Sequence, residues 1–160
     1  MGSVSDLPVV EKAIDILRDY NIQTEVRVLS AHRCPDEARE FARTARESGF
    51  YVIIAAAGMA AHLAGAVAAN TTLPVIGIPC KSAALDGMDA LLSTVMMPPG
   101  IPVAAVTAGK AGGKNAALYA LSILALNDPE LGKKLHDFRK EQQAQVLAAD
   151  AELQDQLNKR

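Results

Sequence analysis

The chain has 160 residues and a formal net charge of −2 without a long run of Lys or Arg, which disfavours nucleic-acid binding. It has no apolar stretch of about 18 residues, so we expect no membrane span. Its N-terminus has no basic region followed by an apolar segment, so we expect no signal peptide. Cys34 and Cys80 lack metal-ligand or disulfide spacing, which favours a cytoplasmic location.

Helical and β-rich segments alternate along the chain, and half of the residues are apolar, mainly Ala, Val, Ile and Leu. This alternation predicts an α/β fold, a three-layer doubly wound parallel sheet of the flavodoxin or Rossmann kind. In chain order we predict a helix over 7–20, a strand over 24–29, a helix over 36–48, a strand over 51–56, a helix over 59–70, a strand over 74–79, a helix over 86–97, a strand over 102–107 and a helix over 115–126.

The two ends of the chain depart from this rhythm. The first strand is apparently missing, because Met1-Gly2-Ser3-Val4-Ser5-Asp6 leads directly into a helix. After Asp128-Pro129 we predict a long polar helix whose apolar stripe thins beyond Gln142. We therefore expect an α/β catalytic domain over 1–128 and a C-terminal helical extension over 129–160 that packs on a neighbouring subunit.

Polar and small residues gather in five turns at the expected carboxyl ends of the strands, where parallel sheets bind ligands. In the first turn, Ser3 and Ser5 suit a phosphate, and Asp6 suits the two hydroxyls of a ribose. A purely structural role is an equally good interpretation of this turn taken alone, because Ser5 and Asp6 also suit the cap of a helix.

The second turn holds the strongest candidates for chemistry. Ser30 and Arg33 are a plausible phosphate pair, and His32 between them can take and give a proton near neutral pH. The alternative is a structural histidine beside a surface arginine. Cys34 is considered as a nucleophile, but a role as a small apolar filler fits it better, as it does Cys80.

The other turns give weaker signals. Gly58 and His62 belong to a small-residue turn in which the backbone can approach a flat ligand, although a histidine among small residues more often serves packing or an interface than catalysis. The glycine-rich segment 109–114 resembles a mobile flap, but it lacks the spacing of a phosphate loop. No dinucleotide fingerprint or metal-ligand set is present, so we expect neither a cofactor nor a metal.

Five of these motifs, in register over residues 1–140, resemble the PurE family. They are Gly2-Ser3-Val4-Ser5-Asp6, Ser30-Ala31-His32-Arg33-x-Pro35, Ala60-Ala61-His62-Leu63, Leu73-Pro74-Val75-Ile76-Gly77-Ile78-Pro79 and Gly109-Lys110-Ala111-Gly112-x-Lys114-Asn115-Ala116. Class I members of this family are mutases of purine biosynthesis. They move the carboxylate of N5-carboxyaminoimidazole ribonucleotide from the exocyclic nitrogen to carbon 4 of the imidazole ring.

The resemblance implies that His32 handles the protons and that no cofactor is needed. It implies substrate binding by Ser3, Asp6 and Arg33. Ser5 and Ser30 match positions that line the phosphate and ribose pocket, and Gly58 and His62 match the loop near the imidazole. The family assembles as an octamer, so we expect a homo-oligomer, with an octamer the expected form, and a small ribonucleotide as the substrate.

Two other functions remain open at this point. Class II relatives carboxylate aminoimidazole ribonucleotide with free carbon dioxide, but they have Lys after the turn histidine, where this chain has Arg33. A non-catalytic sensor of a phosphorylated sugar would keep Ser3, Asp6 and Arg33 but would not need His32. The chain also departs from the usual motifs at Met59, where Gly is usual, and at Cys34, where Thr is usual.

Overall fold

The computed structural model describes residues 1–83 and 85–159. Its sheet consists of three parallel strands in the order β1 (Ile53–Gly58), β2 (Val75–Cys80) and β3 (Ala104–Ala105). The first two run side by side through their whole length, from the pair Ile53 and Val75 to the pair Gly58 and Cys80. The predicted parallel α/β sheet is confirmed, although the third strand is much shorter than the predicted range 102–107.

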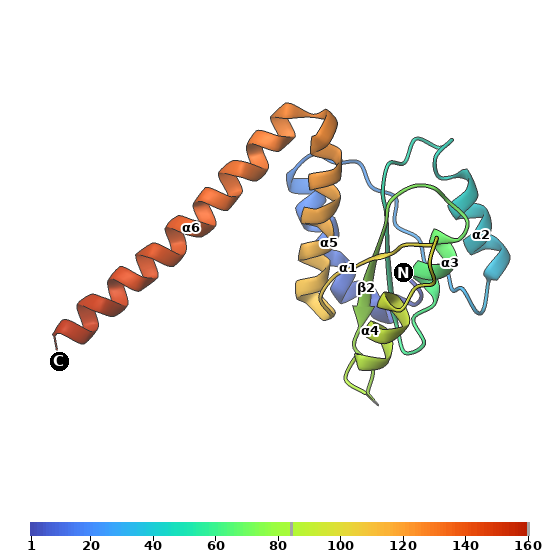
Figure 1. The fold of residues 1–160 in the computed structure, drawn as a ribbon, viewed down its shortest axis with the longest axis horizontal. Helices are drawn as coiled ribbons and strands as arrows, with labels where there is room; N and C mark the ends of the chain where they lie inside the picture. Colours follow the sequence, from blue (N-terminus) through green and yellow to red (C-terminus); the bar gives the residue numbers. More distant parts are fainter. Residues whose placement is uncertain (84, 160) are drawn as a thin grey trace. The chain divides into compact units, whose positions relative to one another are not determined.

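Helices alternate with these strands along the chain (Figure 1). They are the 3₁₀ helix η1 (Val4–Asp6), α1 (Leu7–Asp19), α2 (Pro35–Thr44), α3 (Leu63–Ala68), α4 (Met88–Val95), α5 (Gly109–Leu124), the 3₁₀ helix η2 (Ala125–Asn127) and α6 (Pro129–Asn158). The chain forms two compact units, Met1–Ile123 and Leu124–Arg160.

The sheet is covered by helices on both faces, as a three-layer α/β fold requires. Ile53 and Ala55 of β1 point to one face, where they pack with residues of α2 and α3. Ala56 points to the other face, which it shares with residues of α1 and α5. Helix α4 lies on the same face as α3, because a Cβ on Gly77 of β2 would meet side chains of both helices. The alternation follows from the two-residue period of a strand.

The N-terminal residues take a strand-like position at the open edge of β1. Gly2 N donates a hydrogen bond to Ala56 O at 2.9 Å, and on the other side Met1 O accepts one from Leu29 N at 2.9 Å. The Met1 ammonium group also donates to Arg27 O at 2.9 Å. These two residues therefore bridge β1 to the segment that sequence analysis assigned to the strand over 24–29.

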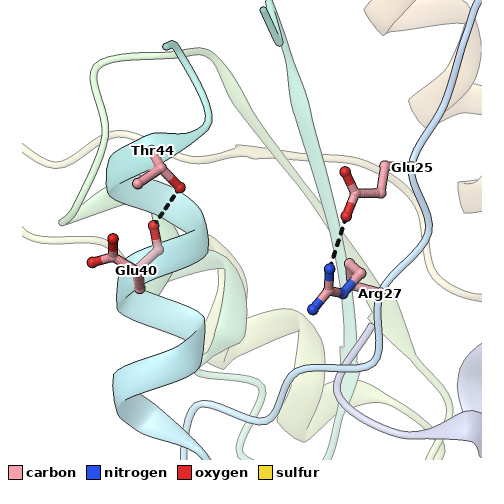
Figure 2. A network of polar contacts seen from close by, with 4 residues as sticks. All are labelled: Glu25, Arg27, Glu40 and Thr44. Carbon is pink, nitrogen blue, oxygen red and sulfur yellow. Dashed lines mark hydrogen bonds and ion pairs between the residues drawn. The ribbon is translucent and has the colours of Figure 1, made fainter. Parts of the chain in front are cut away.

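The prediction of a strand over 24–29 is wrong, although the segment is extended. Met1 and Gly2 contact only its last residues, and Val26 and Val28 remain exposed. In Figure 2 the side chains of Glu25 and Arg27 point to the same side and form an ion pair of 3.0 Å, as residues two apart do on an extended chain. Without a partner along its first half, the segment forms no regular ladder.

Several helices are shorter than predicted because the backbone turns at specific residues. Helix α2 ends at Thr44, whose hydroxyl donates to Glu40 O at 2.8 Å (Figure 2). Gly49, which directly follows the predicted range 36–48, has a φ of +86° in the turn after the helix. Helix α3 begins at Leu63 instead of residue 59, because Met59 itself has a φ of +56°.

The expected flap over 109–114 is instead the beginning of helix α5. Gly112 and Gly113 are buried there, since a Cβ on Gly112 would lie 1.8 Å from Thr107 O and one on Gly113 would lie 2.1 Å from Val9 O. The glycines therefore allow the close approach of α5 to α1 and to the strand end before it. The prediction of a mobile flap is wrong.

Helix α6 begins where the sequence predicted, after Asp128 and with Pro129 in its first turn. The Asp128 carboxylate accepts a hydrogen bond from Leu131 N at 3.0 Å, which caps the helix. Its later apolar side chains, Val146, Leu147, Leu153 and Leu157, are exposed. Within residues 1–83 and 85–159, no helix has the length and apolar character that a membrane span needs.

Candidate functional site

A cavity of 760 Å³ opens at the carboxyl ends of β1 and β2. This volume lies in the range of ligand-binding pockets. All eight residues that sequence analysis singled out lie on its wall: Ser3, Ser5, Asp6, Ser30, His32, Arg33, Gly58 and His62. The wall comes from four turns, those at 2–6, 30–33, 57–63 and 81–89. The fifth predicted turn, 108–114, contributes no lining residue to this cavity, because Gly109–Lys114 form the start of helix α5.

The first turn is held by a reciprocal pair of hydrogen bonds between its own residues. Ser3 Oγ accepts from Ser5 N at 3.3 Å, and Asp6 Oδ2 accepts from Ser3 N at 3.1 Å. The Ser5 hydroxyl donates to Ser3 Oγ at 2.9 Å. The capping interpretation named Ser5 and Asp6; it is confirmed for Asp6 and wrong for Ser5, because Ser3 is the residue that caps the 3₁₀ helix η1 together with Asp6. Ser3 and Asp6 also line the cavity, so the turn combines a structural role with a ligand-facing position.

Asp6 is a carboxylate with only 8% of its surface exposed. Burial raises its pKa, and the Ser3 amide, the Cys80 thiol and the N-terminal ammonium group oppose this shift. A partly desolvated carboxylate on the wall of a cavity is well suited to accept hydrogen bonds from two neighbouring hydroxyls of a ligand.

Replacing Asp6 with asparagine should stabilise the fold at neutral pH. The folded state raises the pKa of Asp6 above its ordinary value of 3.8. The free energy of unfolding therefore falls as the pH rises from 3.8 through the pKa of the folded state, and the whole loss is present at higher pH. Asp6→Asn removes that loss and keeps an oxygen for the Ser3 amide. Urea unfolding at pH 7.5 and pH 3.5 measures the effect: the variant should be more stable than the parent only at pH 7.5. A variant less stable than the parent at pH 7.5 would contradict this explanation.

The second turn connects to the first through Arg33. Its Nη2 donates to Gly2 O at 3.2 Å, and its Nε and backbone N lie 3.4 and 3.2 Å from Ser30 Oγ. The guanidinium is thereby held on the cavity wall between the Ser30 hydroxyl and the Gly2 carbonyl, on a wall that Ser3 and Ser5 also line. A fixed guanidinium on the same wall as several serine hydroxyls is typical of a phosphate site.

The two cysteines are not placed as nucleophiles. Cys34 Sγ accepts from Ser30 N at 3.0 Å and lies 3.4 Å from Ser30 O, so it stabilises the second turn from within. Cys80 is buried, and this burial, together with the adjacent Asp6, raises the pKa of its thiol to about 12. A thiol in that environment stays protonated and unreactive at neutral pH.

The two histidines of the site contact each other directly. His32 Nε2 and His62 Nδ1 are 2.6 Å apart, and the two rings meet edge to face with their centres 4.8 Å apart. A hydrogen bond of this length requires one nitrogen to carry the proton and the other to accept it. The pair therefore holds a proton between residues from two turns, at the wall of the cavity.

The fourth turn adds polar residues that the sequence only weakly signalled. Ser82 Oγ lies 3.0 and 2.9 Å from the two carboxylate oxygens of Asp89, the second residue of α4. Lys81 forms a 2.5 Å ion pair with Asp86. Asp89 lies seven residues beyond Ser82 and inside a helix, so the turn residues alone could not identify it as part of the wall. No motif in the sequence marks Asp89 as a residue of the site.

Met59 has a backbone conformation that glycine would adopt without strain. Its φ is +56°, and its side chain is largely exposed at the cavity wall. The other non-glycine residues with positive φ in the described part of the chain are Asn21 and Asp86, which are types that tolerate this conformation.

Together these groups can perform three tasks on the wall of one cavity. Arg33 and the serines suit an anionic group, Asp6 suits a diol, and the histidine pair suits the transfer of a proton to and from a bound ring. A ligand that carries a phosphate, a diol and a ring that exchanges a proton would find a suitable partner for each group on this wall.

Comparisons with known proteins agree with this arrangement. The family model described as AIR carboxylase matches residues 1–145. N5-carboxyaminoimidazole ribonucleotide mutase of Pyrococcus abyssi is 56% identical over 88% of the chain and 80% of that protein. The mutase of the same name from Bacillus subtilis is 52% identical over 96% of the chain and 94% of its own length. A crystal structure of Treponema denticola PurE has a TM-score of 0.84 and 28% identity, covering 96% of this chain and 94% of that one.

Proposed function

The chain belongs to the AIR carboxylase family, and from this membership we infer that it is an enzyme of purine biosynthesis, an N5-carboxyaminoimidazole ribonucleotide mutase. The reaction transfers a carboxylate from the exocyclic nitrogen of the ribonucleotide to carbon 4 of its imidazole ring. In this proposal Arg33, Ser30 and the first-turn serines bind the phosphate, Asp6 binds the ribose, and His32 acts as the general acid and base.

One observation carries the assignment of His32. Its Nε2 lies 2.6 Å from His62 Nδ1 on the wall of a cavity that also holds a guanidinium and a buried carboxylate. A sensor of phosphorylated sugars needs the guanidinium and the carboxylate, but it has no use for two imidazoles that share a proton. The pair therefore favours catalysis over simple binding.

The histidine pair fits the proton balance of the reaction. One proton goes from His32 to the exocyclic nitrogen as the nitrogen–carbon bond of the carbamate breaks, which leaves an amine and carbon dioxide. Carbon 4 then attacks the carbon dioxide and forms the new carbon–carbon bond. His32 takes the proton of carbon 4, the ring regains its aromaticity, and the histidine returns to its first protonation state. No metal or cofactor takes part in this scheme.

His62 supports that cycle through its contact with His32. Since the nitrogens share a hydrogen bond, the orientation of the His32 ring is fixed relative to the small-residue turn at 57–62. This turn also brings Gly58 to the same wall, and a residue without a side chain lets the backbone approach a flat ring. We propose that Gly58 and His62 contact the imidazole end of the substrate.

An assay of the purified chain with both candidate substrates tests the proposed reaction. We expect conversion of N5-carboxyaminoimidazole ribonucleotide to the 4-carboxy product without added bicarbonate, and no comparable activity on aminoimidazole ribonucleotide at physiological bicarbonate. Activity that strictly depends on bicarbonate would instead assign the chain to the carboxylases that use free carbon dioxide. Binding without turnover of either compound would favour a sensor.

We further propose that the chain works in the cytoplasm as a homo-oligomer, with the octamer as the expected form. In this assembly the extension 129–160 packs on a neighbouring subunit and residues 1–128 form the catalytic domain. The exposed Val146, Leu147, Leu153 and Leu157 of α6 support an apolar contact of this kind. Light scattering of the purified protein measures the number of chains directly, and a monomer at micromolar concentration would contradict the proposal.

A further inference from the structure

The substrate of the proposed reaction carries two separate anionic groups, a phosphate and a carboxylate. The described cavity wall carries two cationic side chains, Arg33 and Lys81, and two carboxylates, Asp6 and Asp89. Arg33 is already fixed by the Ser30 hydroxyl and the Gly2 carbonyl. A second anionic group that leaves water for this cavity needs a charged partner of its own, since an unpaired buried charge is costly.

Lys81 lies on the cavity wall in a different turn from Arg33. It directly follows Cys80, which pairs with Gly58 across the two parallel strands. Its backbone therefore continues beside the turn that carries Met59 and His62, and a Cβ on Gly58 would lie 3.7 Å from Lys81 O. Lys81 thus lies in a turn that follows β2 beside the turn of His62, while Arg33 is tied to the first turn through its hydrogen bond to Gly2 O.

The present partner of Lys81 can be exchanged easily. Its ammonium group pairs with Asp86 at 2.5 Å, but the two side chains are 69% and 80% exposed. An ion pair between exposed groups adds little stability, because water and salt compete with it. Asp86 lies within the same turn and keeps the lysine side chain in the region of the cavity without committing it to a strong bond.

We propose that Lys81 binds the migrating carboxylate of the substrate, and that it exchanges Asp86 for this carboxylate when the ribonucleotide enters. The proposal rests on the proposed function, because it needs a ligand that carries a carboxylate on its imidazole end. An ammonium group there holds the carboxylate before the carbamate breaks and again after the carbon–carbon bond has formed. The flexible stem of lysine suits a carboxylate that changes its position on the ring.

Binding measurements with two ribonucleotides test this role, because aminoimidazole ribonucleotide has the phosphate but lacks the carboxylate. Lys81→Met should weaken binding of the 4-carboxy product by about tenfold and change binding of aminoimidazole ribonucleotide less than about twofold. Lys81→Arg should recover most of the loss. Equal weakening for both compounds would place Lys81 at the phosphate, and no weakening of either would remove it from the site; both results overturn the proposal.

Asp86→Asn is the matched variant, since asparagine tolerates the φ of +53° at this position. It frees Lys81 from its present partner, so it should bind the carboxylated product at least as tightly as the parent does. Weaker binding by this variant would contradict the exchange. A parent chain that binds neither ribonucleotide would refute the proposed function itself. If the parent binds both and Lys81→Met does not selectively weaken binding of the 4-carboxy product, only the role of Lys81 is refuted.

Discussion

Replacing His32 with asparagine should lower the turnover number by about 10²–10⁴-fold and leave ribonucleotide binding within about threefold of the parent. Asparagine has a similar size and can still form a hydrogen bond with His62 Nδ1, but it cannot take up and return a proton. The loss should therefore fall on the chemical steps and not on the affinity, because Arg33, Asp6 and the serines remain in place. Rapid-quench assays together with calorimetric titration of the product separate the two quantities.

His136→Asn is the control for this experiment. His136 is exposed on α6 and does not belong to the residues that line the cavity. It should keep the turnover number of the parent. Unchanged turnover in His32→Asn would remove the catalytic assignment and favour the sensor, while a loss of binding as large as the loss of turnover would make His32 a binding residue.

Replacing Gly113 with alanine should destabilise the protein by about 3 kcal/mol. The added Cβ would lie 2.1 Å from Val9 O, a backbone atom of α1, and 3.3 Å from Lys12 Cβ. Neither atom can move without shifting α1 relative to the sheet, and the first turn of the cavity leads directly into that helix. Chemical unfolding should therefore show a lower midpoint, and ribonucleotide binding should weaken with it.

Gly132→Ala provides the opposite expectation with the same chemical change. Gly132 lies inside α6, and a Cβ there meets no atom within 4 Å. Alanine should stabilise that helix by about 0.5–1 kcal/mol, because glycine is the poorer helix former. Equal effects of the two substitutions would show that close packing of α5 on α1 does not explain Gly113.

The alternation of elements could be predicted because each segment has a strong period or apolar run of its own. β1 and β2 are continuous apolar runs, and Asp128 and Pro129 indicate the capped start of α6. The failures have a different origin. Residues 24–29 form no strand because Met1 pairs only with the end of the segment. The glycines at the start of α5 are explained by the packing of α1 against them, which the sequence alone does not show.

The candidate site could be predicted to a similar degree for the same reason. Ser3, Asp6, His32 and Arg33 occur in short turns that follow or replace strand ends, so topology alone brings them to one edge of the sheet. The direct contact of His32 with His62 could not be predicted, because it depends on rotamers of residues 30 positions apart. The same holds for Asp89, which reaches the cavity from within a helix.

A crystal structure of the chain with the 4-carboxy product bound tests the central claim most directly. The claim is that one cavity holds the sugar phosphate and presents the reacting ring to a histidine pair. The product should lie with its phosphate within about 3 Å of the Arg33 guanidinium and with carbon 4 of its ring within about 4 Å of a nitrogen of His32. A product bound outside this cavity, or bound with its ring turned away from both histidines, would contradict the account.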